Sequence, residues 1–71
     1  KFDIIFLDPP YKDKNLKNFL NEIINKKILN KNGVIILHRH KNEPNIFPSS
    51  LELIEQKIYG ISKIIFLSII D

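Results

Sequence analysis

Two adjacent prolines, Pro9 and Pro10, follow a six-residue apolar run, Phe2–Leu7, that only Asp3 interrupts. Neither proline can donate a backbone hydrogen bond, and each restricts the residue before it to extended conformations. The run is therefore predicted to be a buried strand that ends abruptly where the prolines begin. A chain built on such a strand must place a rigid loop at the strand's carboxyl end.

Apolar residues then recur at intervals of three and four, the spacing that lays one stripe along a helix. The stripe consists of Leu16, Phe19, Leu20, Ile23, Ile24, Ile28 and Leu29. Asp13 or Asn15 is predicted to cap the start of this helix. Lys26 and Lys27 suit its carboxyl end, and Gly33 with the residue before it is predicted to stop it. We interpret the stripe as core, not as a cofactor contact.

Residues 34–37 are continuously apolar, as expected of a parallel strand that is covered on both faces. Strand, helix and strand then form one crossover unit. Pro44 and Pro48 mark 41–50 as a loop. The segment 51–59 fits either helical or strand spacing; we favour a strand, because Gly60 and an Ile-rich run, 61–70, follow at once. The predicted fold is α/β, a parallel strand-helix-strand unit followed by an antiparallel hairpin.

A length of 71 residues allows one small core, so 1–71 is predicted to be a single partial domain. The absence of Cys excludes a disulfide-stapled scaffold and thiolate metal sites. The net charge of +3 comes from lysines spread along the chain and is weak support for nucleic-acid binding. No apolar run approaches the roughly 20 residues of a membrane-spanning helix. The start at Lys1 has neither an initiator Met nor the features of a secretory leader, so we expect it to lie within a larger protein.

The loop that begins at Asp8 has a specific chemistry. Because two imide nitrogens carry no hydrogen, the loop offers acceptors without competing donors: the Asp8 carboxylate and the Pro9 carbonyl. Two neighbouring acceptors suit a planar amino group. Its nitrogen lone pair becomes localised when both of its N–H groups donate hydrogen bonds to these acceptors. Tyr11 adds an aromatic face on which a nucleic-acid base can stack. The structural alternative is a rigid turn that simply ends the strand.

His38, Arg39 and His40 lie at the carboxyl end of the second parallel strand and are expected at the same edge of the sheet as the loop. A functional interpretation gives Arg39 a phosphate contact and the histidines a base or water contact. A metal site would need a third ligand that no nearby His or Cys supplies. The alternative is a polar strand exit leading into a surface loop.

Three segments resemble one family of enzymes: "FDIIFLDPPY", "GVIILHRHK" and "YGISKIIFL". They are similar to the RsmD-like small-subunit ribosomal RNA (guanine-N2)-methyltransferases, a branch of the amino-methyltransferases. The resemblance implies that Asp8 and Pro9 hold the target amine, that Tyr11 stacks on the base, and that Pro10 shapes the loop. It covers only the carboxyl-terminal half of the family's Rossmann-like class I sheet. The family's glycine-rich cofactor loop and ribose-binding acidic residue have no counterpart here.

The resemblance implies a cytoplasmic enzyme that transfers a methyl group from S-adenosylmethionine to guanine in small-subunit ribosomal RNA. His38 and Arg39 join Tyr11 as candidate substrate-binding residues. The expected partners are this RNA and a missing N-terminal half of the same fold, with no membrane and no metal. Two alternatives stay open: a non-catalytic fragment or interaction module, and an adenine amino-methyltransferase acting on DNA.

Overall fold

The computed structural model describes residues 1–8 and 15–70. Within these ranges the elements are β1 (Phe2–Leu7), α1 (Leu16–Asn25), β2 (Leu29–His40), β3 (Leu51–Tyr59) and β4 (Ser62–Ile69). The strands form one sheet in the order β1-β2-β4-β3, in which β1 and β2 are parallel and the other pairs are antiparallel. This arrangement confirms the predicted α/β class.

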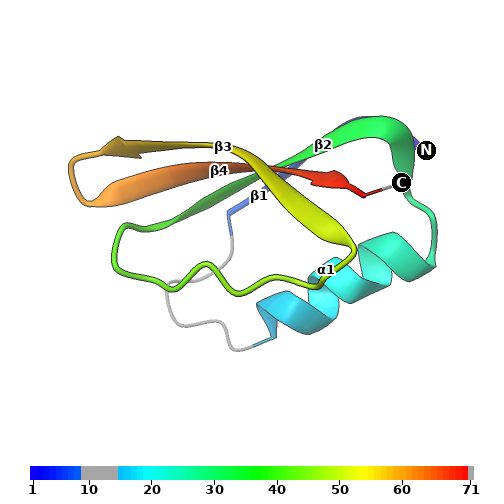
Figure 1. The fold of residues 1–71 in the computed structure, drawn as a ribbon, viewed down its shortest axis with the longest axis horizontal. Coiled ribbons are helices and arrows are strands. Elements are labelled where there is room, and N and C mark those ends of the chain that lie inside the picture. Colours follow the sequence, from blue (N-terminus) through cyan, green and yellow to red (C-terminus); the bar gives the residue numbers. More distant parts are fainter. Residues whose placement is uncertain (9–14, 71) are drawn as a thin grey trace.

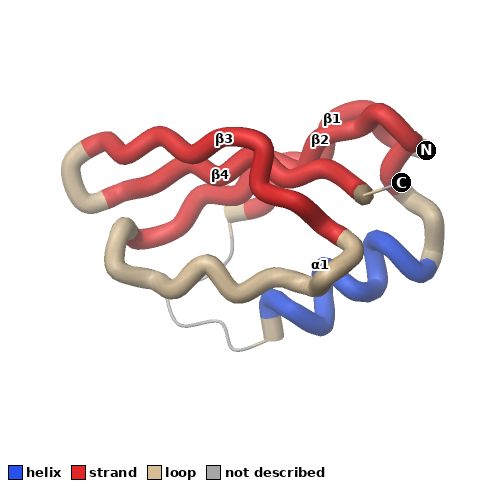
Figure 2. Tube along the Cα trace, viewed as in Figure 1, coloured by secondary structure: helices blue, strands red, loops and turns tan. Residues whose placement is uncertain are grey.

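The core lies between one face of the sheet and a layer made by α1 and the loop 41–50 (Figure 1; Figure 2). Side chains alternate between the faces of a strand, so Ile35 and Leu37 point toward α1 while their neighbours point away. In register with them lie Leu67 and Ile65 of β4. The buried apolar residues are Leu16, Leu20, Ile23, Leu29, Ile35, Leu37, Leu51, Ile65 and Leu67.

The predicted end of the helix is wrong, because α1 ends well before Gly33. Lys27 adopts a positive φ of 52°, which turns the chain out of the helix. Leu29, the last member of the predicted stripe, already belongs to β2 and pairs with Phe2 of β1. It is nevertheless buried, with 3% exposure. Helix and strand contribute to the same core, so apolar spacing alone does not separate them.

The predicted helix caps are met in part. Asn15 occupies the N-cap position and its carbonyl oxygen accepts the Phe19 N–H at 2.9 Å, but its side chain makes no capping hydrogen bond. Asp13, the other candidate, lies outside the described residues. Lys26 is the C-cap residue, and its N–H donates to the Glu22 carbonyl oxygen at 2.9 Å. Its ammonium group also lies 3.9 Å from the Glu22 carboxylate.

The predicted C-terminal hairpin is confirmed. Residues 51–59 form β3 and pair with β4, with Tyr59 opposite Ser62. Gly60 in the turn has a positive φ of 58°, a conformation that glycine adopts without the steric cost of a Cβ atom. The register shifts once, between Leu53 and Glu55.

One face of the sheet is left uncovered by the described residues, which differs from the prediction of strands buried on both faces. Ile4 and Phe6 of β1 are 62% and 60% exposed on the face opposite α1. By register this face continues through Val34 and Ile36 of β2 to Phe66 of β4. We call the surface made by these residues the uncovered face. β1 is also an edge strand, with one side of its backbone unpaired by the described residues.

Candidate active site

The carboxyl ends of the parallel strands β1 and β2 bring two predicted site residues together. Leu7 pairs with Leu37, so Asp8 and His38 are the next residues along each strand. His38 Nδ1 lies 3.0 Å from Asp8 Oδ1. Both side chains are accessible, with 61% exposure for Asp8 and 36% for His38. Pro9, Pro10 and Tyr11 lie outside the described residues, so their predicted roles stay predictions.

The chemistry of this pair follows from its atoms. An ionised carboxylate only accepts hydrogen bonds, so the His38 ring must donate through Nδ1–H. This contact occupies Asp8 Oδ1 and leaves Oδ2 able to accept a hydrogen bond from a ligand. The pair therefore presents an oriented carboxylate at the edge of the sheet where ligands of open α/β folds bind.

Arg39 is not part of this pair. It follows His38 in β2 and therefore points to the opposite face of the sheet. Its side chain is only 10% exposed, and its Nη2 atom lies 3.3 Å from Glu43 Oε2. The guanidinium thus has a structural partner in the loop, and its predicted phosphate contact stays a prediction. His40 accepts the Asn42 backbone N–H through Nδ1 at 3.1 Å.

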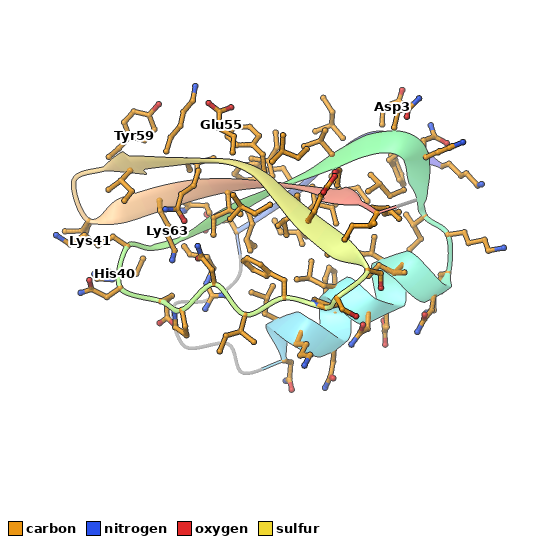
Figure 3. The ribbon with its side chains drawn as sticks, in the orientation of Figure 1. Asp3, His40, Lys41, Glu55, Tyr59 and Lys63 are labelled. Atoms are coloured by element: carbon orange, nitrogen blue, oxygen red, sulfur yellow. The ribbon has the colours of Figure 1, made fainter. Side chains whose placement is uncertain are left out.

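Lys63 is a buried cation that sequence reasoning missed. It is 4% exposed and lies on the side of the sheet that faces the loop 41–50 (Figure 3). Its ammonium group donates to the Glu43 carbonyl oxygen and, at 2.6 Å, to Asn45 Oδ1. Burial lowers the pKa of Lys63, the positive charge of Arg39 lowers it further, and the Glu43 carboxylate raises it. Lys63 therefore fastens the loop to the sheet.

Asn45 links Lys63 to the edge strand β3 through hydrogen bonds. Its Oδ1 atom accepts from Lys63, while its Nδ2 atom donates to Gln56 Oε1 of β3 at 2.7 Å. A single amide side chain thus connects the loop to both strands of the hairpin. The sequence signal for this cluster is a lysine within the apolar run 61–70. That this lysine faces α1 follows from the register of β4 against β2.

In the described residues the two glycines do not belong to a glycine-rich cofactor loop. The chain has two glycines, and both have structural roles. A Cβ atom on Gly33 would lie 2.5 Å from Leu29 Cδ1, so this glycine makes room for a core leucine. Gly60 has nothing within 4 Å of its Cβ position and serves the hairpin turn. The contacts of both glycines are therefore explained by the packing of Leu29 and by the hairpin turn.

The described part of the chain comprises residues 1–8 and 15–70. Across these ranges, no three His, Asp or Glu side chains gather in a way that could hold a metal ion. No helix in the same ranges has both the length and the apolar character needed to cross a membrane.

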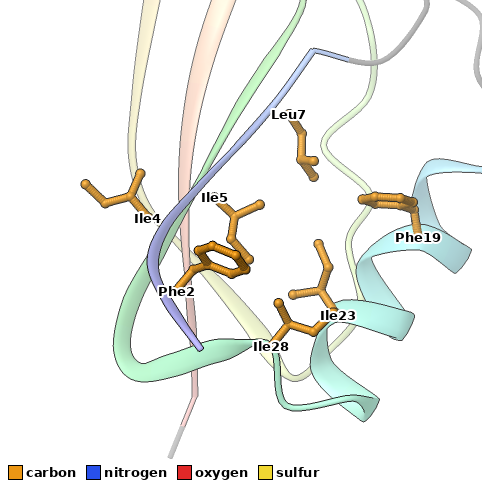
Figure 4. A pocket seen from close by; sticks show the side chains of 7 residues that line it. All are labelled: Phe2, Ile4, Ile5, Leu7, Phe19, Ile23 and Ile28. Carbon is orange, nitrogen blue, oxygen red and sulfur yellow. The ribbon is translucent and has the colours of Figure 1, made fainter.

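An apolar cleft of about 270 Å³ opens between β1 and α1. From β1 it is lined by Phe2, Ile4, Ile5 and Leu7, of which Ile4 extends away from the other three in Figure 4. From the helix side it is lined by Phe19 and Ile23, with Ile28 below them. β1 thus has apolar surface on both sides, next to its unpaired edge.

Comparison with known proteins gives consistent matches over nearly the whole chain. The family model described as conserved hypothetical protein 95 matches residues 1–68. Ribosomal RNA small subunit methyltransferase D of Buchnera aphidicola is 39% identical over 57 residues, which cover 80% of this chain and 30% of that protein. An uncharacterized methylase of Rickettsia prowazekii is 29% identical over 66 residues, which cover 93% of this chain and 28% of that protein.

Among solved structures, a methylase of Haemophilus influenzae has the same fold, with a TM-score of 0.82 and 26% identity. The match covers 99% of this chain and 44% of that one. The chain therefore spans less than half the length of the relatives it matches. Because this family model matches residues 1–68, the chain belongs to the conserved hypothetical protein 95 family, the family of RsmD-like methyltransferases.

Proposed function

We propose that this chain is the half of a methyltransferase that holds the target amine. The enzyme would methylate the exocyclic amine of a guanine in small-subunit ribosomal RNA. The observation that carries the proposal is the accessible Asp8 carboxylate, held beside His38 at the carboxyl edge of the parallel strands. The printed name of the Buchnera relative supports the substrate class. An enzyme acting on this RNA is expected in the cytoplasm.

Asp8 contributes an acceptor at the reacting nitrogen. An amine attached to a base ring is a poor nucleophile, because its lone pair is delocalised into the ring. When the Asp8 carboxylate and the Pro9 carbonyl oxygen accept hydrogen bonds from its two N–H groups, the lone pair becomes localised and the nitrogen becomes more reactive. The nitrogen gains positive character as it is methylated, so a negative carboxylate stabilises the transition state more than the ground state.

The rest of the enzyme would pack against β1. The uncovered face and the cleft are apolar, and exposed apolar surfaces of this kind mark interaction sites. The relatives contain more than twice the length matched here, so the occupant we propose is the missing N-terminal half of the same fold. That half would also hold S-adenosylmethionine, which supplies the methyl group when bound.

Substitutions in the complete methyltransferase, assayed with its RNA, test the roles of Asp8 and Tyr11. Asp8→Ala and Asp8→Asn are expected to lower kcat by about a hundredfold or more, with a smaller change in RNA affinity. Tyr11→Ala is expected to weaken RNA binding by the roughly 1–3 kcal/mol of a stacking contact, because stacking acts in the ground state and the transition state alike. Tyr11→Phe keeps the aromatic face and is the matched control.

A near-normal kcat in the Asp8→Ala enzyme would remove the carboxylate from the mechanism. The loop would then be a strand-ending turn, and the chain's apolar surfaces would favour the second candidate, a non-catalytic interaction module.

A further inference from the structure

We propose that His38 is a positioning residue that fixes the orientation of the Asp8 carboxylate. The inference rests on the proposed function and deepens it, because it assigns His38 to the carboxylate and not to the RNA. It starts from the 3.0 Å contact between His38 Nδ1 and Asp8 Oδ1.

The two residues differ in how firmly the fold holds them. His38 lies inside β2, where it is paired with Ile64 of β4 and follows the fully buried Leu37. Asp8 lies beyond the end of β1, and its side chain is 61% exposed. An exposed aspartate otherwise samples several rotamers. A donor on β2, an internal strand of the sheet, selects the rotamer that turns Oδ1 to the imidazole and leaves Oδ2 for the substrate amine.

The contact also determines which ring nitrogen of His38 carries the proton. Donation to Asp8 requires the Nδ1–H tautomer, whereas a neutral histidine in water favours Nε2–H. His40 provides an internal comparison, because its Nδ1 atom accepts the Asn42 backbone N–H and its proton must therefore be on Nε2. The chain has two histidines, and the hydrogen bonds they make require opposite tautomers when both rings are neutral.

Nitrogen-15 NMR of the histidine rings tests this arrangement without an activity assay. At a pH where both rings are neutral, we expect His38 to be Nδ1-protonated and His40 to be Nε2-protonated. In the Asp8→Ala variant, His38 is expected to revert to Nε2–H while His40 does not change. A cross-strand contact between Leu37 and Ile65 shows in each sample that the sheet is folded. An Nε2–H tautomer for His38 in the folded wild-type protein would overturn the inference.

The kinetic test uses the complete methyltransferase and two substitutions of His38. His38→Phe keeps a ring but removes the donor, and is expected to lower kcat about tenfold, the low end for a hydrogen bond to a charged group. His38→Asn keeps an amide N–H near the position of Nδ1 and is expected to restore most of that loss. RNA affinity should change little in either, since the proposed role is to orient Asp8.

The outcomes separate this inference from the proposed function. If Asp8→Ala abolishes methylation but His38→Phe retains the wild-type kcat, the positioning role is wrong and the proposed function stands. If Asp8→Ala retains activity, the proposed function fails first. A loss of RNA affinity in His38→Phe at constant kcat would return His38 to the direct RNA contact.

Discussion

At the scale of single residues, Lys63 shows how a charge can be kept inside a small sheet. Its ammonium group is buried but has hydrogen-bond acceptors on the loop, from the Glu43 carbonyl and Asn45. A buried cation without such partners would cost several kcal/mol. The hydrogen bonds offset part of this cost and determine where the loop 41–50 lies.

Replacing Lys63 by Met should destabilise the protein in a pH-dependent manner. The variant leaves the Glu43 carbonyl oxygen and Asn45 Oδ1 without this donor, and an unsatisfied acceptor costs up to about 1–3 kcal/mol when it is buried. Because both residues are only partly shielded from water, the cost here is expected at the low end of that range. Because burial lowers the pKa of Lys63 below 10.5, the unfolded state binds this proton more tightly than the native state. The contribution of Lys63 to the unfolding free energy of the wild-type protein therefore rises as the pH rises from the lowered pKa toward 10.5.

Urea unfolding of wild type and Lys63→Met across this pH range measures the effect. The difference in unfolding free energy should widen with rising pH. Lys41→Met, at an exposed lysine that begins the same loop, should follow the wild-type pH dependence. A constant difference at all pH values would show that the Lys63 charge is not desolvated.

Sequence reasoning found some site residues and missed others for a physical reason. Asp8 stood out because its neighbours are prolines, and His38 because it follows an apolar strand. That they contact each other depends on the register of β1 against β2, which no local pattern contains. Lys63 was not recognised, because in a lysine-rich chain one more lysine is expected to be solvated.

At the scale of elements, the type of each strand and helix was predictable, but the end of α1 and the start of β2 were not, since β2 begins at Leu29 and not at residue 34. The hairpin 51–69 followed from Ile-rich strands around Gly60, and β1 from the prolines after it. The end of α1 was misplaced because Lys27, an ordinary residue in a positive-φ conformation, carries no sequence signal. The glycine that does stand out, Gly33, belongs to a strand.

The two glycines should therefore respond differently to substitution. Gly33→Ala introduces a Cβ atom 2.5 Å from Leu29 Cδ1 and 3.0 Å from the Asn30 carbonyl oxygen, which overpacks the core at a cost of about 1–3 kcal/mol. Gly60→Ala meets no atom within 4 Å, so its cost is the left-handed backbone alone, roughly 1–2 kcal/mol.

Unfolding midpoints of three variants distinguish these causes. Gly60→Asn should be milder than Gly60→Ala, because asparagine tolerates a left-handed conformation. A Gly33→Ala protein as stable as wild type would mean that Leu29 moves aside at no cost.

At the scale of the whole molecule, the two edges of the sheet are unequal. β3 carries charged residues Glu52, Glu55 and Lys57, which oppose association of an edge strand. β1 has one charge, Asp3, and exposes Ile4 and Phe6 beside the apolar cleft. The predicted burial of β1 is therefore not met by the described residues, because its side chains are exposed or only half-buried.

The isolated chain should self-associate through β1. Sedimentation at increasing concentration is expected to show dimers or larger species, because unpaired backbone groups lie next to exposed apolar side chains. Phe6→Lys places a charge on the uncovered face and should shift the chain toward monomer. Ile58→Lys replaces an apolar residue on β3 that is exposed to a similar extent, 58%, and should not shift the chain toward monomer. A monomeric wild-type chain at high concentration would indicate a complete small domain.

Adding the proposed N-terminal half to the isolated chain tests both the association through β1 and the binding of the cofactor. If that half covers β1, it should replace self-association by a one-to-one complex, and Phe6→Lys should weaken this complex as it weakens the homotypic one. Calorimetric titration of S-adenosylmethionine should give no binding to the chain alone, because its two glycines are committed to Leu29 and to the hairpin turn. Binding should appear in the complex. Micromolar binding by the chain alone would show that residues of this chain suffice for the cofactor, and would contradict the division of the site between two halves.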